Sequence, residues 1–155
     1  MAAPVRTQLD ISRLLTEAGT VLSNRLAAAL AEVDLTPRAQ CVLIHALEEE
    51  RTQIQLAALA GLDKTTMVGT VDDLERRGLA ERRPSATDRR ARIIAVTEPG
   101  RAAAEEGQRI VDRVHEEVLA DVEPARREVF LDLLIGLASA EPVPGPKAIR
   151  RPRGR

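Results

Sequence analysis

Residues 61–97 place a helix with a polar start directly before an arginine-rich hairpin, and this order constrains the fold more than any other feature of the chain. Gly61 supplies a tight turn and Asp63 is a favourable N-cap, so we expect a helix from about Lys64 to Arg77. The helix should stop at Gly78, because glycine tolerates the left-handed backbone that ends many helices. Its apolar stripe, spaced by three and four residues, consists of Val68, Val71, Leu74 and Leu79.

A shorter helix is predicted just upstream. Thr52 and Gln55 have the spacing of a capping box, and Gly61 marks the end of the helix. The apolar residues of this segment are Ile54, Leu56, Ala57, Leu59 and Ala60. Two short helices joined by a glycine turn indicate a helix-turn-helix.

Two short runs with strand character follow the second helix, Leu79–Arg82 and Arg92–Val96, and the loop between them contains Asp88. This pattern predicts a β-hairpin, or wing. Residues 76–92 hold seven arginines against Glu81 and Asp88, a local charge of +5 in a chain of net charge -1. Such clustering is typical of a surface that contacts phosphate.

The first turns of the longer helix carry short polar side chains, which allow a helix to enter the major groove and touch base edges. We therefore expect double-stranded DNA as a partner. The candidate contact residues on this helix are Lys64, Thr65, Thr66 and Thr70.

The stretch at residues 71–100, VDDLERRGLAERRPSATDRRARIIAVTEPG, resembles the MarR family of multiple antibiotic resistance regulators. The shared pattern is a leucine-glutamate helix end, Gly-Leu, a basic strand with proline, Asp-x-Arg and Thr-x-x-Gly. A looser resemblance covers about residues 9–139 and implies a dimeric winged-helix transcription factor. On this resemblance, Arg90 would enter the minor groove and Asp88 would hold the wing. Arg89, between them, is a further candidate DNA contact.

The fold class expected is mainly α with a small β-hairpin wing, a winged helix-turn-helix with dimerisation helices from both chain ends. Four segments follow from this: a dimerisation helix in residues 1–35, the DNA-binding domain in 36–100, dimerisation helices in 101–140 and a basic tail in 141–155. The tail is rich in proline and arginine and is expected to be disordered.

The remaining helices follow from apolar spacing and caps. One long helix is expected over Leu9–Val33, a second after Thr36 and Pro37, another after Thr97, and the last after Pro124. The first and last helices have broader apolar faces than a small DNA-binding core can cover, which indicates a homodimer interface. Its expected residues are Leu15, Leu22, Phe130, Leu133, Leu134 and Leu137.

Composition supports a helical protein. Phe130 is the only aromatic residue, so the core must be aliphatic, which favours helices over sheets. No apolar run approaches the roughly 18 residues of a membrane span, and the N-terminus lacks the apolar segment of a signal peptide. We therefore expect a cytoplasmic protein with no membrane partner. The segments 1–75 and 93–140 each carry a net charge of -5, so the body is acidic and the wing basic.

Enzymatic chemistry has little support in the residues. His45 and His115 fall on separate predicted helices, and Cys41 has no partner at a metal-ligand spacing. No glycine loop for phosphate is present, and an acid-arginine pair at Asp88 and Arg90 would lie at a hairpin tip without a water-excluded pocket. No catalytic residue, cofactor or metal is therefore expected.

Two residues of the second helix remain candidates for other roles. Cys41 lies among apolar residues and is expected to be a buried, unreactive thiol. His45, one turn later, would line an effector pocket if the family resemblance holds, and a plain core or surface histidine is the alternative.

These observations predict a homodimeric transcriptional regulator, a repressor that binds a pseudopalindromic operator and is released by a small-molecule effector. The alternative from a different class is a non-enzymatic helical interaction or adaptor module, in which the hairpin is an ordinary exposed turn and the basic tail binds an acidic partner.

Overall fold

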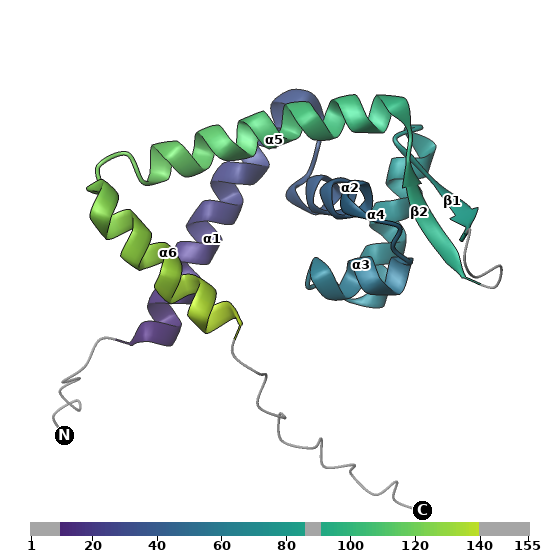
Figure 1. The fold of residues 1–155 in the computed structure, drawn as a ribbon. Coiled ribbons are helices and arrows are strands. Elements are labelled where there is room, and N and C mark those ends of the chain that lie inside the picture. Colours follow the sequence, from purple (N-terminus) through teal and green to yellow (C-terminus); the bar gives the residue numbers. More distant parts are fainter. Residues whose placement is uncertain (1–9, 86–90, 140–155) are drawn as a thin grey trace, which may run out of the picture. The chain divides into compact units, whose positions relative to one another are not determined.

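The computed structural model describes residues 10–85 and 91–139. In chain order the elements are α1 (Ile11–Leu30), the 3-10 turn η1 (Ala31–Val33), α2 (Pro37–Glu48), α3 (Gln53–Leu59), α4 (Lys64–Arg76), β1 (Ala80–Pro84), β2 (Arg92–Val96), α5 (Glu98–Val118) and α6 (Pro124–Ala138) (Figure 1). The predicted fold class, mainly α with a small hairpin, is confirmed. The chain divides into two compact units, residues 1–117 and 118–155, which are described separately.

Polar caps set where the helices begin. Thr36 caps α2, Thr52 and Gln55 form the reciprocal capping box of α3, and Asp63 caps α4, all as predicted. Asp10 caps α1 in the same way. These side chains pair amide groups that the first turn of a helix leaves without partners.

The helix ends also follow the sequence closely. Gly61 and Gly78 both have positive φ, of 61° and 69°, so the two predicted glycine stops are confirmed. The first helix is not continuous to Val33 as predicted, because it tightens into η1 after Leu30. Tight 3-10 turns of this kind are common at helix ends.

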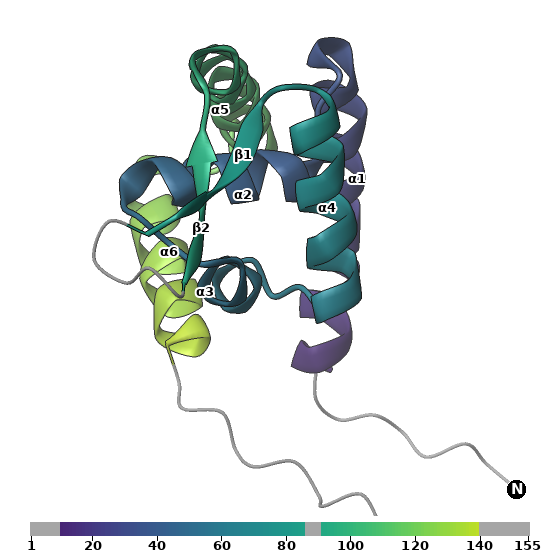
Figure 2. The ribbon, with the colours of Figure 1, turned by 90° about the vertical axis from the view of Figure 1, so that its right-hand side faces the viewer.

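The hairpin pairs β1 with β2 in antiparallel register, from Ala80 opposite Val96 to Pro84 opposite Arg92. Figure 2 shows it beside α4. The first strand begins one residue later than predicted and runs two residues further. A third segment joins the sheet, since Thr52 bridges to Ile93 and the strand is thereby tied to the α2–α3 connection.

An aliphatic core fills the first unit, as the near-absence of aromatics predicted. Its largest fully buried side chains are Leu30, Leu43, Leu56, Met67, Leu74, Ile94, Val42 and Val71. They come from α1, α2, α3, α4 and β2, so the helix-turn-helix and the wing share one core. Burial of each such side chain contributes about 1.5–3 kcal/mol.

The apolar residues of α3 and α4 are not all buried. Leu56 of α3 is buried, but Ile54 and Leu59 are 83% and 51% exposed. A helix of two turns packs only one face, so not every apolar residue of a short segment reaches the core. On α4, Met67 is buried and Val68 is only half-buried, so Met67 rather than Val68 begins the face that packs in the core.

Two helices leave most of their apolar residues in solvent. Within α1 only Leu30 is buried, and α6, in the second unit, buries none of its residues. Among the described residues, no helix combines the length and the apolar character that crossing a membrane requires. The apolar residues of α1 and α6 are therefore left open to a partner in the single chain.

The packing around Gly100 yields a stability prediction. A Cβ atom on Gly100 would lie 1.8 Å from the backbone oxygen of Leu79, whereas a Cβ on Gly69 would meet nothing within 4 Å. We expect Gly100→Ala to lower the free energy of unfolding by about 1–3 kcal/mol. The matched change Gly69→Ala, in the middle of α4, should raise it by about 0.5–1 kcal/mol. Chemical denaturation of both variants measures this, and equal stabilities would contradict the packing described.

Candidate nucleic-acid interface

The start of α4 carries exposed polar side chains. Lys64 and Thr65 are exposed, and the structure gives neither side chain a hydrogen bond or ion pair with the other described residues. Both are therefore free to meet a ligand from solvent. A helix N-terminus with exposed lysine and hydroxyl groups favours an anionic partner.

The other two predicted residues of this helix are already hydrogen-bonded. The Thr66 hydroxyl donates to Asp63 Oδ2 over 2.6 Å, and the Thr70 hydroxyl donates to the backbone oxygen of Thr66 over 2.9 Å. Each hydroxyl keeps lone pairs but has used its hydrogen. In this arrangement Thr66 and Thr70 can accept hydrogen bonds but do not donate them outward.

Asp63 supports this end of α4. Its carboxylate accepts from the Thr66 hydroxyl and from the Thr66 amide, the latter at 2.9 Å, and these bonds, in that order, hold the pKa of Asp63 below its usual value. The ionised cap therefore stabilises the helix at any pH above the carboxyl's unfolded pKa. This contribution is lost as the pH falls through the lowered pKa of the folded state.

The tip of the wing falls outside the described residues. Asp88, Arg89 and Arg90, the three candidates there, are among residues 86–90. The last described bond before this gap joins the Ser85 amide to the Ala91 oxygen at 3.0 Å. The assignment of Asp88, Arg89 and Arg90 as DNA contacts stays a prediction.

Fewer arginines of residues 76–92 are available to contact phosphate than the net charge of this segment indicates. Of the seven in residues 76–92, four pair with carboxylates of this chain: Arg76, Arg77, Arg82 and Arg83. Four of their partners, Asp34, Asp72, Asp73 and Glu75, lie outside the counted segment. Arg92 is exposed and has no ion pair with the described residues. The local excess of +5 is thus largely offset in the fold.

Arg82 joins the wing to both helices of the helix-turn-helix. Its guanidinium donates to Asp72 Oδ1 at 2.7 Å, to Glu75 Oε2 and, from Nε, to Gln53 Oε1 at 3.2 Å. Its backbone amide also donates to Glu75 Oε1 at 2.7 Å. The side chain is half-buried, so these contacts fix the base of the wing relative to α4. We call this set of four residues the Arg82 clamp.

Arg82 was one of the seven arginines expected to contact phosphate, and its place in the clamp was not predicted. A signal was present, because Asp72 and Glu75 lie three residues apart on α4 and so share one face of the helix. That face turns toward the strand that carries Arg82. Only the fold shows which strand it meets.

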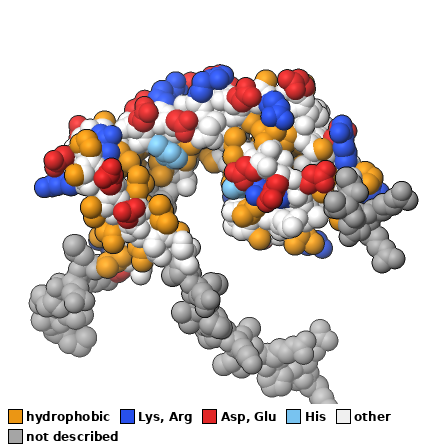
Figure 3. All heavy atoms as spheres, in the orientation of Figure 1, with side chains coloured by type: hydrophobic (Ala, Val, Ile, Leu, Met, Phe, Trp, Pro, Cys, Tyr) orange, Lys and Arg blue, Asp and Glu red, His pale blue; other side chains and the backbone are white. Residues whose placement is uncertain are grey.

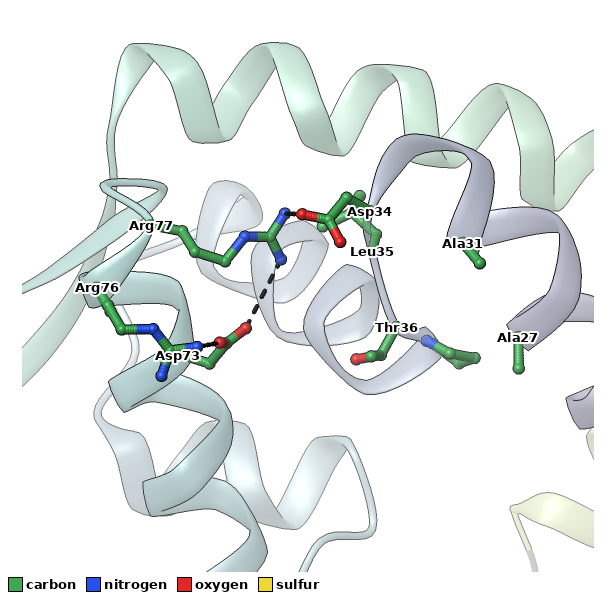
Figure 4. Close-up of a pocket in the computed structure, with 9 residues that line it drawn as sticks. Ala27, Ala31, Asp34, Leu35, Thr36, Asp73, Arg76 and Arg77 are labelled. Carbon is green, nitrogen blue, oxygen red and sulfur yellow. Dashed lines mark hydrogen bonds and ion pairs between the residues drawn. The ribbon is translucent and has the colours of Figure 1, made fainter.

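A second set of ion pairs holds the other end of α4. Arg77 contacts Asp34 at 3.2 Å and Asp73 at 3.6 Å, while Arg76 pairs with Asp73 (Figure 4). Asp34 follows η1 and has a positive φ of 57°. These contacts tie the end of α4 to the α1–α2 turn beside a hollow of about 520 Å³.

His45 lies in a different, smaller cavity. This cavity, of about 220 Å³, opens to solvent between α1, α2 and α5 and is lined by apolar residues together with Gln40, Cys41, His45 and Gln108. The His45 Nδ1 atom lies 3.2 Å from Glu48 Oε2. Cys41 is half-buried rather than fully buried, and burial, with a smaller effect of Glu48, raises the pKa of its thiol. The raised pKa agrees with the expected low reactivity of Cys41.

The residues predicted for a dimer interface are accessible in the single chain. Leu15, Phe130, Leu133 and Leu137 are exposed, and Leu22 and Leu134 are half-buried. Four of these six lie on α6, whose apolar side chains gather on the face that Figure 3 shows.

Comparison with known proteins adds to this geometry. The sequence profile of the MarR family matches residues 33–91. A MarR-family transcriptional regulator from Rhodococcus sp. RHA1 is 32% identical, with 84% of this chain and 93% of that chain covered and a TM-score of 0.77. CouR from Rhodococcus jostii RHA1, solved with p-coumaroyl-CoA, is 33% identical over 87% of this chain and 96% of its own, at a TM-score of 0.77. CouR solved on a 23-mer DNA duplex is 29% identical, with 83% of this chain and 92% of that chain covered and a TM-score of 0.74.

The Arg82 clamp gives a second stability prediction. Arg82→Ala leaves Asp72 and Glu75 near each other without a cation, so we expect a loss of about 1–3 kcal/mol in the free energy of unfolding. The matched variant Arg76→Ala removes an exposed arginine of α4 that pairs with Asp73, and should cost less than about 0.5 kcal/mol. Thermal unfolding distinguishes the two. Equal losses would mean that the clamp contributes no more than a surface ion pair.

Proposed function

The chain belongs to the MarR family of transcriptional regulators, and on that premise we propose that it is a repressor that binds a pseudopalindromic operator as a homodimer and is released by a small ligand. The observation that carries the proposal is the start of α4. Its side chains Lys64 and Thr65 are exposed and unpaired within the described residues, while the other face of α4 is locked into the core. CouR, a relative, was solved on a DNA duplex.

In this proposal two elements contact DNA at once. The first turns of α4 enter the major groove, where Lys64, Thr65, Thr66 and Thr70 face bases or phosphates. The wing reaches the adjacent minor groove through Arg90, with Asp88 and Arg89 beside it. The Arg82 clamp supports this because it holds the base of the wing and α4 in one geometry.

The homodimer is supported by surface that the single chain leaves open. Phe130 and Leu133 on α6 are 46% and 63% exposed, and none of the residues of α6 is buried. A helix of this kind is stable in water when other helices cover it. A second copy is the proposed cover, since a reader of a palindrome needs two recognition helices in fixed spacing.

Release by a ligand is proposed at the cavity that contains His45. This cavity lies between α2, a helix of the DNA-binding segment, and α1 and α5, which lead away from it. CouR was solved with p-coumaroyl-CoA, so a relative binds a small molecule. A ligand that fits only one arrangement of these helices would change the spacing of the two α4 helices, and the dimer would no longer match both half-sites.

Base contact by Thr66 gives a test of operator reading. Thr66→Ala is expected to lower affinity for operator DNA by roughly 1 to 3 kcal/mol and affinity for random duplex much less. The reason is that the Thr66 oxygen, with its hydrogen given to Asp63, can accept from a base amine. Fluorescence anisotropy with duplexes from the DNA upstream of the gene measures both affinities. Equal losses on the two duplexes would assign Thr66 to phosphate contact instead.

The dimer is tested by Leu133→Arg. Leu133 is exposed in the single chain, so a charge there should leave the fold of one chain intact but oppose burial in a dimer. Light scattering should show a dimer for the natural protein at micromolar concentration and a smaller mass for the variant, with weaker operator binding. Glu128→Arg, also exposed on α6, is the control for an added cation. A natural protein that stays monomeric and does not retain operator DNA would favour the adaptor alternative.

A further inference from the structure

Ile54, near the start of α3, is the most exposed large apolar side chain among the described residues. It is 83% exposed, compared with 51% for Leu59 on the same helix. Outside α3, the exposed large apolar side chains lie on α1, on α6 and at the end of α5. The proposed homodimer gives the faces of α1 and α6 a partner but gives none to α3. The exposure of Ile54 therefore calls for a different partner.

Ile54 points away from the core. Leu56 is fully buried, and two residues along an α-helix are separated by about 200° around its axis, so Ile54 lies on the opposite face of α3. On α4, exposed Thr65 has the same relation to buried Met67. Because Leu56 and Met67 belong to one core, Ile54 and Thr65 both face outward from it.

The position of α3 places Ile54 between the two elements proposed to contact DNA. At the start of the helix, Thr52 bridges to Ile93 of the hairpin. At its end, residues 60–63 lead directly into the start of α4, at the same end of the first unit (Figure 2). A helix of seven residues is about 10 Å long, close to the roughly 12 Å width of the major groove. Ile54 thus lies on the outer surface between the hairpin and the first turns of α4.

The surface around Ile54 is uncharged and small. Residues 52–62 contain no charged side chain, although 30% of the residues of the chain are charged. Ala58, one turn after Ile54 on the same face, is exposed and ends at Cβ, so Ile54 projects alone rather than within a broad apolar patch. A stable interface between proteins uses about 20–30 residues from each partner. This surface is therefore too small to hold a protein partner.

DNA offers an apolar group of matching size. The major groove displays the C5 methyl group of thymine, which apolar side chains contact. Lys64 on α4 and Arg92 on β2 belong to the elements next to the end and the start of α3, and both are exposed without an ion pair within the described residues. Cations at these two places suit phosphates, and the uncharged surface between them suits the edge of a base.

We propose that Ile54 is a specificity-determining residue that contacts the C5 methyl group of one thymine in each half-site of the operator. This inference rests on the proposed function, which assigns base contacts to α4 and the wing only. It adds the first helix of the helix-turn-helix to the elements that read sequence. The operator should accordingly require thymine at one position of each half-site, beside the bases that the start of α4 faces.

Replacement of thymine by uracil tests the contact, because uracil lacks only the C5 methyl group. Fluorescence anisotropy is measured with the full-length protein on a duplex from the DNA upstream of the gene, with each thymine replaced in turn. Uracil at the contacted position should weaken binding about fourfold for each half-site, equivalent to about 0.8 kcal/mol, the value of one buried methyl group. Replacement in both half-sites should weaken binding roughly 15-fold.

The Ile54→Ala variant connects the thymine to the residue. It should bind the thymine duplex more weakly and no longer distinguish thymine from uracil at the contacted position, while differences at other thymines remain. A partly unfolded variant would instead bind every duplex more weakly. Leu59→Ala is the matched control, because Leu59 is also an exposed apolar residue of α3 but lies about 140° around the helix axis from Ile54. This control should bind as the natural protein does.

The outcomes separate this inference from the proposed function. Uracil without effect at every thymine, or an Ile54→Ala variant that keeps all the differences of the natural protein, would overturn the contact. Equal losses for Ile54→Ala on the thymine and uracil duplexes would overturn it in favour of the sugar-phosphate backbone. A smaller mass for this variant in light scattering would overturn it in favour of an interface between copies of the chain.

In each of these cases the natural protein still binds the upstream duplex, so the proposed function stands and only the thymine contact fails. If the natural protein retains no upstream duplex, the proposed function itself fails, and the contact of Ile54 fails with it.

Discussion

The burial of one face of α4 is the constraint on which the rest of the first unit depends. Met67, Val71 and Leu74 are fully enclosed by side chains from neighbouring elements, so α4 cannot rotate about its axis without exposing them. Because a helix repeats every 3.6 residues, fixing this face also fixes the direction of every other face. The start of α4, with Lys64 and Thr65, is thereby left in solvent, and Asp72 and Glu75 are turned toward the wing.

Several arginines of this protein form ion pairs that join its own helices and strands. Arg82 holds β1 to α3 and α4, and Arg77 holds the end of α4 to the α1–α2 turn. Both guanidiniums satisfy carboxylates that would otherwise repel a DNA phosphate. An acidic chain can therefore approach DNA because many of its carboxylates are neutralised by its own arginines. A small number of unpaired cations then remain to contact the DNA. Lys64 and Arg92 are cations of this kind within the described residues.

Features encoded by neighbouring residues could be predicted from the sequence. The caps Thr36, Thr52 and Asp63 and the stops at Gly61 and Gly78 each depend on a few adjacent positions, and all are confirmed. The hairpin was also predictable, because its strand residues and arginine-rich loop follow one another directly. The fold class follows from these elements together with an aliphatic composition.

Features set by long-range packing could not be predicted in the same way. Ile54 has the same apolar character as Leu56, and only the position of α3 in the core decides that Leu56 is buried. The role of Arg82 depends on which strand faces α4. The hydrogen bonds that use the hydroxyl hydrogens of Thr66 and Thr70 depend on side-chain rotamers within the helix. For each of these residues the sequence shows a chemical type, and the fold selects its partner.

The contact between α2 and α5 is the part of the fold that a bound ligand could affect in the proposed regulation. Gln40 reaches from α2 to the Ala104 oxygen of α5, and Gly107 allows the two helices to approach that closely. A ligand in the adjoining cavity would stabilise whichever arrangement of α2 and α5 it fits. To move a dimer from almost wholly DNA-competent to almost wholly released, the ligand must favour the released arrangement by about 5.5 kcal/mol in total. One hydrogen bond contributes about 0.5–1.5 kcal/mol, so several contacts together must supply the difference, and two bound copies per dimer would reduce the amount required of each.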